Sequence, residues 1–313
     1  MTEATAHPAR RRLVALFGAT ASGKTAAAVA LRRHLPVEVI SADSRQLRRE
    51  MRIGTAAPTD AELAAVPHHL VAIVAPDAPF ALAAWLDAVR VALEDVWARG
   101  ALPLLVAGTG QYAWALLEGW QVPAVPPDAE LRARLERAAA EGGASGIYER
   151  LLAVDPVSAA RIAPSNVRRV IRALEIVEAT AGPVPPLARR SAEFAWGAVG
   201  LRWPRTVLHT RADARVEAMY AEGLVEETRA LVARYGRAFA ALSSIGYAEA
   251  LRVLDGELSH AEAIAQTKVA THRLIRMQAT WFRDDDARIA WVDGGDAAAV
   301  LAAVEAAARP PVP

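Results

Sequence analysis

The chain has 313 residues, a hydrophobic content of 53% and a formal net charge of +1. The apolar content is ample for a buried core, and the absence of cysteine excludes disulfides, thiolate metal sites and a cysteine nucleophile. The small net charge means that any nucleic-acid ligand requires a local basic patch. The apolar run near the N-terminus is too short for a signal peptide or a membrane span, so we expect no membrane partner. We also expect the protein to be cytoplasmic and monomeric. Residues 1–9 are expected to be a disordered tail.

The first predicted elements are a strand at residues 13–17 and a helix at residues 26–35. The loop between them fits the phosphate-loop pattern G-x-x-x-x-G-K-[ST] in the context that this motif needs. Glycines let backbone N–H groups converge on an anion, and the helix N-terminus and a lysine add positive charge. The sequence therefore predicts a di- or triphosphate site, without revealing whether the ligand is a nucleotide. The residues of the loop are Gly18, Ala19, Thr20, Ala21, Ser22, Gly23, Lys24 and Thr25.

Strands and helices continue to alternate along the chain. Apolar runs predict strands at 37–40, 102–107, 198–203 and 289–292, and helices are expected at 80–99, 204–235 and 260–283. This alternation predicts an α/β fold with a doubly wound parallel sheet, like that of phosphate-loop NTPases. Ligands of such sheets bind beyond the carboxyl ends of the strands. The chemistry is therefore expected in the loops at 18–25, 43–46 and 108–109.

Proline-rich breaks at residues 122–127 and 183–186 interrupt this alternation. The chain between them is helical in pattern and rich in arginine. We therefore predict a helical insertion domain at residues 119–196 within a core domain formed by residues 1–118 and 197–313.

The most basic part of this insertion lies at residues 165–175. Ser165 or Asn166 can cap a helix there, and Arg168, Arg169 and Arg172 fall outside its apolar stripe as a cluster with few nearby acids. Residues 131–172 contain eight arginines against four acids, and Arg132 begins another basic helix. The cluster is either a solvated helix face or a surface that binds a phosphate backbone.

Asp43 and Thr109 each follow a predicted strand. Asp43 is a Mg²⁺ ligand, a general base or a helix N-cap. Thr109 is either a turn residue or a hydroxyl that bridges two substrates. His68 and His69 are neighbours that point apart, so they do not form a metal pair.

The helix expected near the C-terminus has three basic side chains on one face, at i, i+4 and i+8. They are Lys268, His272 and Arg276. Trp281 and Phe282 near the end of this helix are interpreted as core residues.

These motifs together resemble the tRNA dimethylallyltransferases, also called tRNA isopentenyltransferases. Residues 18–25 resemble their G-P-T-A-S-G-K-T loop, and Asp43-Ser44-Arg45-Gln46 matches D-S-R-Q. Residues 103–112 track P-L-L-V-G-G-T-G-L-Y. The likeness runs from about residue 13 to 292, and further matching stretches lie at 51–58, 67–70, 155–175, 245–247 and 278–283.

The resemblance implies transfer of a dimethylallyl group from dimethylallyl diphosphate to N6 of adenosine 37 in the anticodon stem-loop of tRNA. It implies that residues 18–25 and Arg215 hold the diphosphate with Mg²⁺, for which Thr25 is the candidate ligand. Asp43 would be the base on the adenine amine, and Thr109 would lie between the reacting groups. The residues implied to hold tRNA are Asp43, Ser44, Arg45, Gln46, Arg132, Arg168, Arg169, Val170, Ile171, Arg172, Ser243, Ile245, Gly246 and Tyr247.

Several positions depart from the family pattern, but none removes Lys24, Asp43, Thr109 or Arg215. The departures concern contacts with tRNA rather than the reaction. They are Arg48 for tyrosine, Arg52 for aspartate, Ala57 for lysine, Ala107 for glycine, Ala163 and Asn166 in the H-P-N-D stretch, and His272, Leu274 and Met277.

Three other functions share some of these features. A small-molecule kinase would use the loop for ATP and Asp43 to activate a hydroxyl, but it leaves the basic insertion without a role. A regulatory GTPase needs an N-K-x-D motif, which cannot exist because Asn166 is the only asparagine. A pure RNA-binding module would not need the phosphate loop.

Overall fold

The computed structural model describes residues 11–309, which fall into two compact units. The first unit comprises Met1–Ala78, Trp85–Gly119 and Ser191–Pro313, and the second comprises Pro79–Ala84 and Trp120–Arg190. Residues 1–9, expected as a tail, lie outside the described residues. Within residues 11–309 no helix has both the length and the apolar character that crossing a membrane requires.

The first unit is built on a six-stranded sheet in the order β3-β2-β4-β1-β7-β8, and every pairing in it is parallel. The parallel sheet predicted from the alternation of strands and helices is confirmed. Strand β2 is buried along its whole length because helices cover both faces of the sheet. The strands are β1 (Arg12–Phe17), β2 (Val37–Ala42), β3 (His68–His69), β4 (Leu102–Ala107), β7 (Ala195–Arg202) and β8 (Ile289–Asp293).

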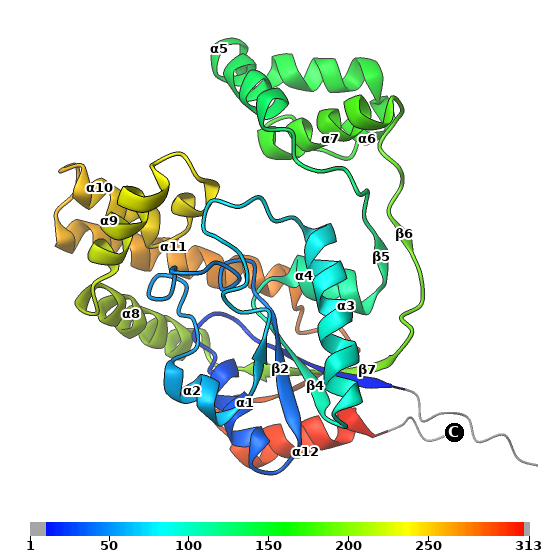
Figure 1. Ribbon diagram of the computed structural model, residues 1–313, viewed down its shortest axis with the longest axis vertical. Helices are drawn as coiled ribbons and strands as arrows, with labels where there is room; N and C mark the ends of the chain where they lie inside the picture. The colour runs from blue at the N-terminus through cyan, green and yellow to red at the C-terminus, as the bar shows by residue number, and fades with distance from the viewer. Residues whose placement is uncertain (1–10, 310–313) are drawn as a thin grey trace, which may run out of the picture. The chain divides into compact units, whose positions relative to one another are not determined.

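Helices α1 (Lys24–Arg32) and α12 (Ala297–Ala308) cover one face of the sheet, with α2 (Asp60–Ala65) beside α1. Val14 and Leu16 of β1 share a core cluster with α1 and α12. Figure 1 shows α1 and α12 lying close together beside the sheet. Helices α3 (Leu82–Ala98) and α4 (Gly110–Leu117) pack on the other side. There the ring of Phe17 lies 5.4 Å from that of Trp114.

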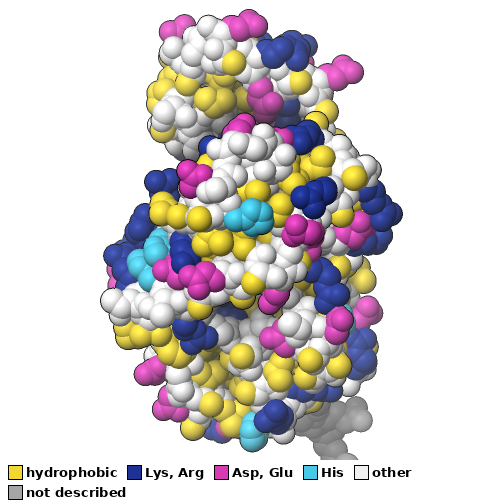
Figure 2. Space-filling model, turned by 90° about the vertical axis from the view of Figure 1, so that its left-hand side faces the viewer, with side chains coloured by type: hydrophobic (Ala, Val, Ile, Leu, Met, Phe, Trp, Pro, Cys, Tyr) yellow, Lys and Arg dark blue, Asp and Glu magenta, His cyan; other side chains and the backbone are white. Residues whose placement is uncertain are grey.

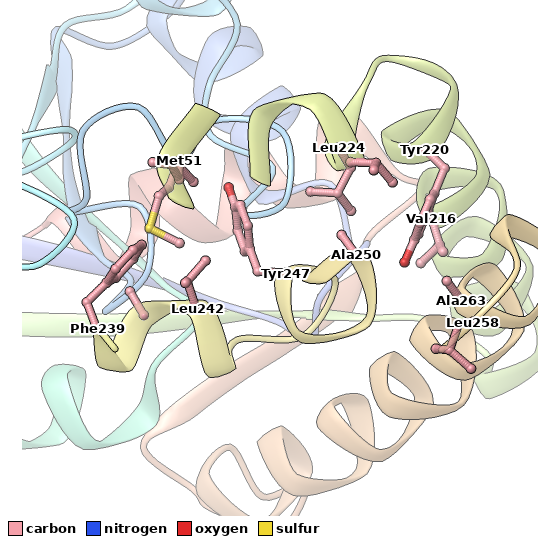
Figure 3. Close-up of a cluster of buried hydrophobic side chains, with 13 residues drawn as sticks. Met51, Val216, Tyr220, Leu224, Phe239, Leu242, Tyr247, Ala250, Leu258 and Ala263 are labelled. Carbon is pink, nitrogen blue, oxygen red and sulfur yellow. The ribbon is translucent and has the colours of Figure 1, made fainter. Parts of the chain in front are cut away.

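The rest of the first unit is helical. It contains α8 (Arg205–Ala221), α9 (Leu224–Tyr235), a 3₁₀ turn at Ala240–Ser243, α10 (Tyr247–Leu254) and α11 (His260–Trp281). The single helix expected over 204–235 is wrong, because Gly223 has φ of 99° and separates α8 from α9. A positive φ of this kind favours glycine and ends a regular helix. These helices share a core around the fully buried Tyr247, which also includes Met51 (Figure 3).

The second unit contains α5 (Ala129–Val154), α6 (Pro156–Ala159) and α7 (Val167–Thr180), together with an antiparallel pair of β5 (Trp120–Gln121) and β6 (Ala188–Arg189). Helix α5 is kinked at Gly143, whose φ is 78°. The predicted apolar stripe of α7 packs against α5 in a core of its own. Asn166, rather than Ser165, caps α7 by accepting a hydrogen bond from the Arg169 N–H.

A buried carboxylate holds α5 and α7 together. Glu175 is 1% exposed and accepts hydrogen bonds from Arg132, Arg172 and the Asp128 N–H. Burial opposes ionisation of Glu175, but these donors outweigh it and hold the pKa of the carboxyl below its usual value. The ionised carboxylate therefore stabilises this unit.

We predict that Glu175→Ala lowers the free energy of unfolding by roughly 2–3 kcal/mol, less than a fully buried pair costs because both arginines are partly exposed. Urea unfolding measures the change. The matched control is Glu178→Ala on the same helix, which loses only an exposed ion pair with Arg134 and should cost less than about 0.5 kcal/mol. Because the folded pKa of Glu175 is lowered, its contribution is full above about pH 4.3 and is lost as the pH falls through the folded pKa. Equal effects of the two substitutions at neutral pH would contradict this role.

Candidate active site

The phosphate loop joins β1 to α1 at the carboxyl edge of the sheet. Ala21 and Gly23 have positive φ values of 64° and 86°, and the Ser22 N–H closes the turn on the Ala19 carbonyl at 3.1 Å. Trp203, which follows β7, donates its indole N–H to the Ser22 carbonyl at 3.0 Å. Side chains from a neighbouring strand end therefore support the loop predicted from the motif.

The ammonium group of Lys24 lies inside this loop. Its Nζ donates to the carbonyl oxygens of Gly18 and Ala19 at 2.8 and 3.0 Å. Burial and the positive charge of Arg215 lower the pKa of Lys24 to about 8, although Asp43 acts in the opposite direction. The pKa of Arg215 is likewise lowered by burial and by Arg211, and raised by Asp43. The charges of Lys24, Arg215 and Asp43 thus interact, and a bound anion would favour the charged forms of Lys24 and Arg215.

Asp43 and Thr109 meet where β2 and β4 end side by side. Oδ1 of Asp43 accepts hydrogen bonds from the N–H groups of Arg45 and Gln46 at 2.8 and 3.3 Å. The hydroxyl oxygen of Thr109 accepts from the Ser44 N–H at 3.1 Å, and no side-chain hydrogen bond from Thr109 caps α4. One carboxylate oxygen of Asp43 therefore closes a turn, and no helix follows it, so Asp43 is not a helix N-cap. Its other oxygen, Oδ2, would lie 2.8 Å from a Cβ at Gly108, so a side chain there would displace the carboxylate.

Two cavities adjoin these groups. The first, here called the loop cavity, has a volume of about 420 Å³ and is lined by Lys24, Thr25, Arg211 and Arg215 among others. The second, the carboxylate cavity, has a volume of about 490 Å³, and its lining includes Asp43, Ser44, Thr109 and Trp281.

One loop contributes to both walls. Ile53 and Ala56 line the loop cavity, and Gly54 and Thr55 line the carboxylate cavity. The loop cavity and the carboxylate cavity therefore lie on opposite sides of this segment of chain.

Glu227 holds this segment in place. Its carboxylate accepts from the N–H groups of Arg52, Ile53 and Gly54, and from the Tyr247 hydroxyl at 2.5 Å. Burial first, and then the charge of Glu227, raise the pKa of Tyr247. The sequence analysis missed Glu227, because a glutamate on a helix gives no sign that it binds backbone from a distant loop.

A second missed contact comes from Gln278 of α11, which bonds both the phosphate loop and the turn before Thr109. Nearby, Phe282 is buried as expected and stacks on Phe17 at 4.5 Å. The interpretation of Trp281 as a core residue is wrong, since it is 37% exposed and lines the carboxylate cavity. A Cβ at Gly110 would lie 2.3 Å from the Trp281 Cβ, so this approach also requires glycine.

The residues of the first unit that are implied to hold tRNA fall into two groups. Ser44, Arg45, Ser243 and Ile245 line the carboxylate cavity. Tyr247 does not, because its side chain is fully buried and bonded to Glu227. Gly246 is also buried, next to the start of α10, where its N–H donates a hydrogen bond to the Glu249 carboxylate.

Gln46 has an internal role as well. Its amide donates to the Ala56 carbonyl at 3.0 Å, and this bond connects the turn after β2 to the loop between the two cavities. Of the three basic side chains on one face of α11, Lys268 pairs with Glu217 and His272 pairs with Asp213. The third is Arg276. His69 pairs with Glu38, and Nδ1 of His68 lies 2.8 Å from the Val66 carbonyl oxygen.

In the second unit, Arg168 and Arg169 are exposed, and neither forms an ion pair within residues 11–309. The prediction that these arginines have few acids nearby is wrong for Arg172, which forms an ion pair with the buried Glu175. Arg132 also pairs with Glu175. Val170 and Ile171 are buried in the core of this unit, so their side chains are unavailable to tRNA. Figure 2 shows basic and acidic side chains interspersed on the face that it draws, which fits the small net charge.

The departures from the family pattern lie in different places. Arg52 and Ala57 line the loop cavity, where Arg52 also pairs with Asp60. Arg48 donates to the Ala75 carbonyl at 3.0 Å, and Leu274 and Met277 line the carboxylate cavity. Ala107 is buried at the end of β4, and Ala163 is exposed.

The lowered pKa of Lys24 makes anion binding depend on pH. Above pH 8 the free protein holds Lys24 neutral, so binding of pyrophosphate requires a proton to be taken up. We predict that the affinity for inorganic pyrophosphate, measured by calorimetry, falls by up to about tenfold per pH unit above pH 8. Lys24→Arg keeps its charge over this range and is the control for ionisation of the ligand. Parallel curves for the two proteins up to pH 9.5 would refute the prediction.

Comparison with known proteins agrees with this geometry. Residues 46–285 match the sequence profile of the IPP transferase family, and residues 11–70 match the isopentenyl transferase profile. The tRNA dimethylallyltransferase of Roseiflexus castenholzii is 48% identical over 275 residues, which cover 87% of this chain and 89% of that protein. The enzyme of the same name from Chloroflexus aurantiacus is 48% identical over 273 residues, covering 87% and 92%.

A solved structure is similar as well. The full-length tRNA isopentenylpyrophosphate transferase of Bacillus halodurans is 37% identical and superposes with a TM-score of 0.64, covering 91% of this chain and 90% of that one. These likenesses favour prenyl transfer over the small-molecule kinase. The chain belongs to the IPP transferase family.

Proposed function

We propose that this chain transfers a dimethylallyl group from dimethylallyl diphosphate to N6 of adenosine 37 in the anticodon stem-loop of tRNA. The observation that carries the proposal is the pairing of two adjoining cavities, one lined by Lys24, Thr25 and Arg215 and the other by Asp43 and Thr109. The membership of the chain in the IPP transferase family supports it.

The loop cavity suits the leaving group. As the bond between the allylic carbon and the diphosphate oxygen breaks, its electron pair stays with the diphosphate. Lys24, Arg215 and the start of α1 stabilise this charge in a partly buried site. The diphosphate also keeps Lys24 protonated by supplying the negative charge that its surroundings lack.

The carboxylate cavity suits the acceptor. The adenine amine is a weak nucleophile that forms the new N6–carbon bond as it gives up one proton. Asp43 Oδ1 is occupied by two backbone donors, which leaves Oδ2 to receive that proton. Thr109, held by Ser44, would lie between the reacting groups. The target base leaves its stack to enter this cavity, as in other enzymes that modify bases.

Mg²⁺ fits at the loop cavity as an ion that arrives with the diphosphate. Within residues 11–309 no three histidine or acidic side chains gather to hold a metal. Mg²⁺ commonly binds through few protein ligands, its waters and the phosphates of the substrate. The Thr25 hydroxyl, at the start of α1 and on the cavity wall, is the residue that would hold it. The ion would add positive charge against the departing diphosphate.

The direct test is incubation with unmodified tRNA and labelled dimethylallyl diphosphate, followed by mass analysis of the nucleosides. We expect N6-dimethylallyladenosine at position 37 and release of pyrophosphate. ATP serves as the rival donor, and phosphate transfer from ATP without prenylation would refute the proposal.

Asp43→Asn separates the two roles of this carboxylate, because the amide oxygen can still accept from Arg45 and Gln46 while the base is lost. We predict that kcat falls by about 10²–10⁴-fold. The Kd for tRNA, measured by filter binding, should change less than about threefold. The control is Asp87→Asn, an exposed residue paired only with Arg90. Unchanged kcat in Asp43→Asn would remove Asp43 from the role of base.

Arg168 and Arg169 are the side chains of α7 that remain exposed for a phosphate backbone. We predict that reversing both to Glu weakens tRNA binding and reduces the slope of log K against log salt by about one per residue. The control carries the same change of charge on exposed residues of the first unit, as Arg90→Glu with Arg229→Glu. If both double variants show the same slope, Arg168 and Arg169 form only a solvated helix face.

A further inference from the structure

A single buried amide connects two of the loops at the sheet edge. Gln278 lies on α11 and is 6% exposed. Its Oε1 accepts a hydrogen bond from the Thr20 N–H at 2.7 Å, and its Nε2 donates to the Gly108 carbonyl at 2.8 Å. Thr20 belongs to the phosphate loop, and Gly108 directly precedes Thr109. One side chain therefore contacts both the loop after β1 and the turn after β4.

The chemistry of the bridge requires a group that accepts at one end and donates at the other. A neutral amide does both, and an apolar side chain would leave a buried N–H and a buried carbonyl unpaired. The Thr20 N–H that Gln278 occupies is one of the backbone donors of the phosphate loop. Gln278 thus fixes which loop donors remain for an anion.

The surroundings show why this residue affects the reacting groups. A Cβ placed on Gly108 would lie 2.8 Å from Asp43 Oδ2 and 3.9 Å from Gln278 Nε2. The bridge therefore ends beside the oxygen that is assigned to receive the proton. Its other end lies four residues before Lys24 in the sequence.

The end of α11 is itself well anchored. The Trp281 carbonyl accepts from the Trp114 indole N–H at 2.9 Å, and Phe282 stacks on Phe17, the last residue of β1. A side chain on this helix is therefore held relative to the sheet, as a group that fixes geometry must be.

We propose that Gln278 is a positioning residue that sets the phosphate loop at a fixed distance from Asp43 and Thr109. Its side chain forms part of the lining of the carboxylate cavity, and we assign its effect to the two loops that it joins. This inference rests on the proposed function, because the distance matters only when a leaving group and an acceptor must be aligned. Small misplacements of reacting groups are known to cost large factors in rate.

Gln278→Glu tests the bridge with a change of few atoms. The ionised carboxylate can accept from Thr20 but repels the Gly108 carbonyl and Asp43, whereas the protonated acid donates to Gly108 and restores both bonds. We expect kcat at pH 8 to fall at least thirtyfold with the KM for dimethylallyl diphosphate changed less than threefold. The ratio of variant to wild-type kcat should rise at least tenfold as the pH is lowered to 6. Gln278→Leu should show the loss without the recovery.

The matched control is Gln266→Glu on the same helix, where the exposed amide accepts only from Arg252. Its kcat ratio should stay near one at every pH. A Gln278→Glu ratio that does not change with pH would overturn the proposal. A rise in KM together with a loss of stability, with kcat unchanged, would overturn it as well.

A second readout needs no turnover. The melting temperature of Gln278→Glu relative to Gln266→Glu should fall as the pH rises, because burial beside Gly108 and Asp43 raises the pKa of the new carboxyl and favours its protonated form. A constant difference would disprove the bridge itself. Failure of the wild type to prenylate tRNA would instead count against the proposed function, and the melting data would still decide whether the bridge exists.

Discussion

Lys24 is partly buried and, within residues 11–309, forms no ion pair with a carboxylate, and this constraint governs the rest of the site. Among the described residues its ammonium group donates to the carbonyl oxygens of its own loop, and its pKa falls to about 8 because desolvation and Arg215 disfavour the charge. A folded protein tolerates such a group where a ligand supplies the missing charge. An incoming diphosphate would do so, and it would meet Lys24 and Arg215 together. In the proposed reaction the departing diphosphate thus supplies the negative charge that Lys24 and Arg215 require.

The order of strands in the sheet places the loop of Lys24 beside the turns that carry Asp43 and Thr109. Because β1, β4 and β2 are neighbours and parallel, the loops that follow them leave the same edge. The loop after β1 holds the anion site, and the turns after β2 and β4 bring Asp43 to Thr109. The segment at Arg52–Ala57, held by Glu227, separates the two cavities without adding charge to the acceptor side. A leaving group and an acceptor can therefore approach from opposite sides of a narrow wall.

The sequence was sufficient for the parts of this arrangement that depend on local pattern. Apolar runs located the six-residue strands β1, β2 and β4, and the phosphate-loop motif located Lys24 with its strand and helix. The rule that ligands bind beyond the carboxyl ends of parallel strands pointed to the loops that carry Asp43 and Thr109, whereas the strand order that makes these loops neighbours came from the structure. The break at Gly223 was missed because a glycine within a helical pattern is often tolerated, and only its φ of 99° shows that the helix ends there.

The rest could not be predicted because it depends on partners far apart in the chain. The buried Tyr247 and the partly buried Glu227 form a hydrogen bond beside the Arg52–Ala57 segment, and no spacing in the sequence indicates it. Arg172 and Arg132 are residues of the type that binds nucleic acid, yet both form ion pairs with Glu175. Gln278 is 170 residues from Gly108 and 258 from Thr20, so its bridge exists only in the folded chain. Buried polar contacts of this kind need the tertiary structure.

The most direct test of the account is a crystal structure with dimethylallyl thiolodiphosphate, an unreactive analogue of the donor. We predict that its diphosphate lies in the loop cavity against Lys24, Thr25 and Arg215, with the allylic carbon directed toward Asp43 and Thr109. A diphosphate bound elsewhere, or an isoprenoid carbon directed away from Asp43, would contradict the account.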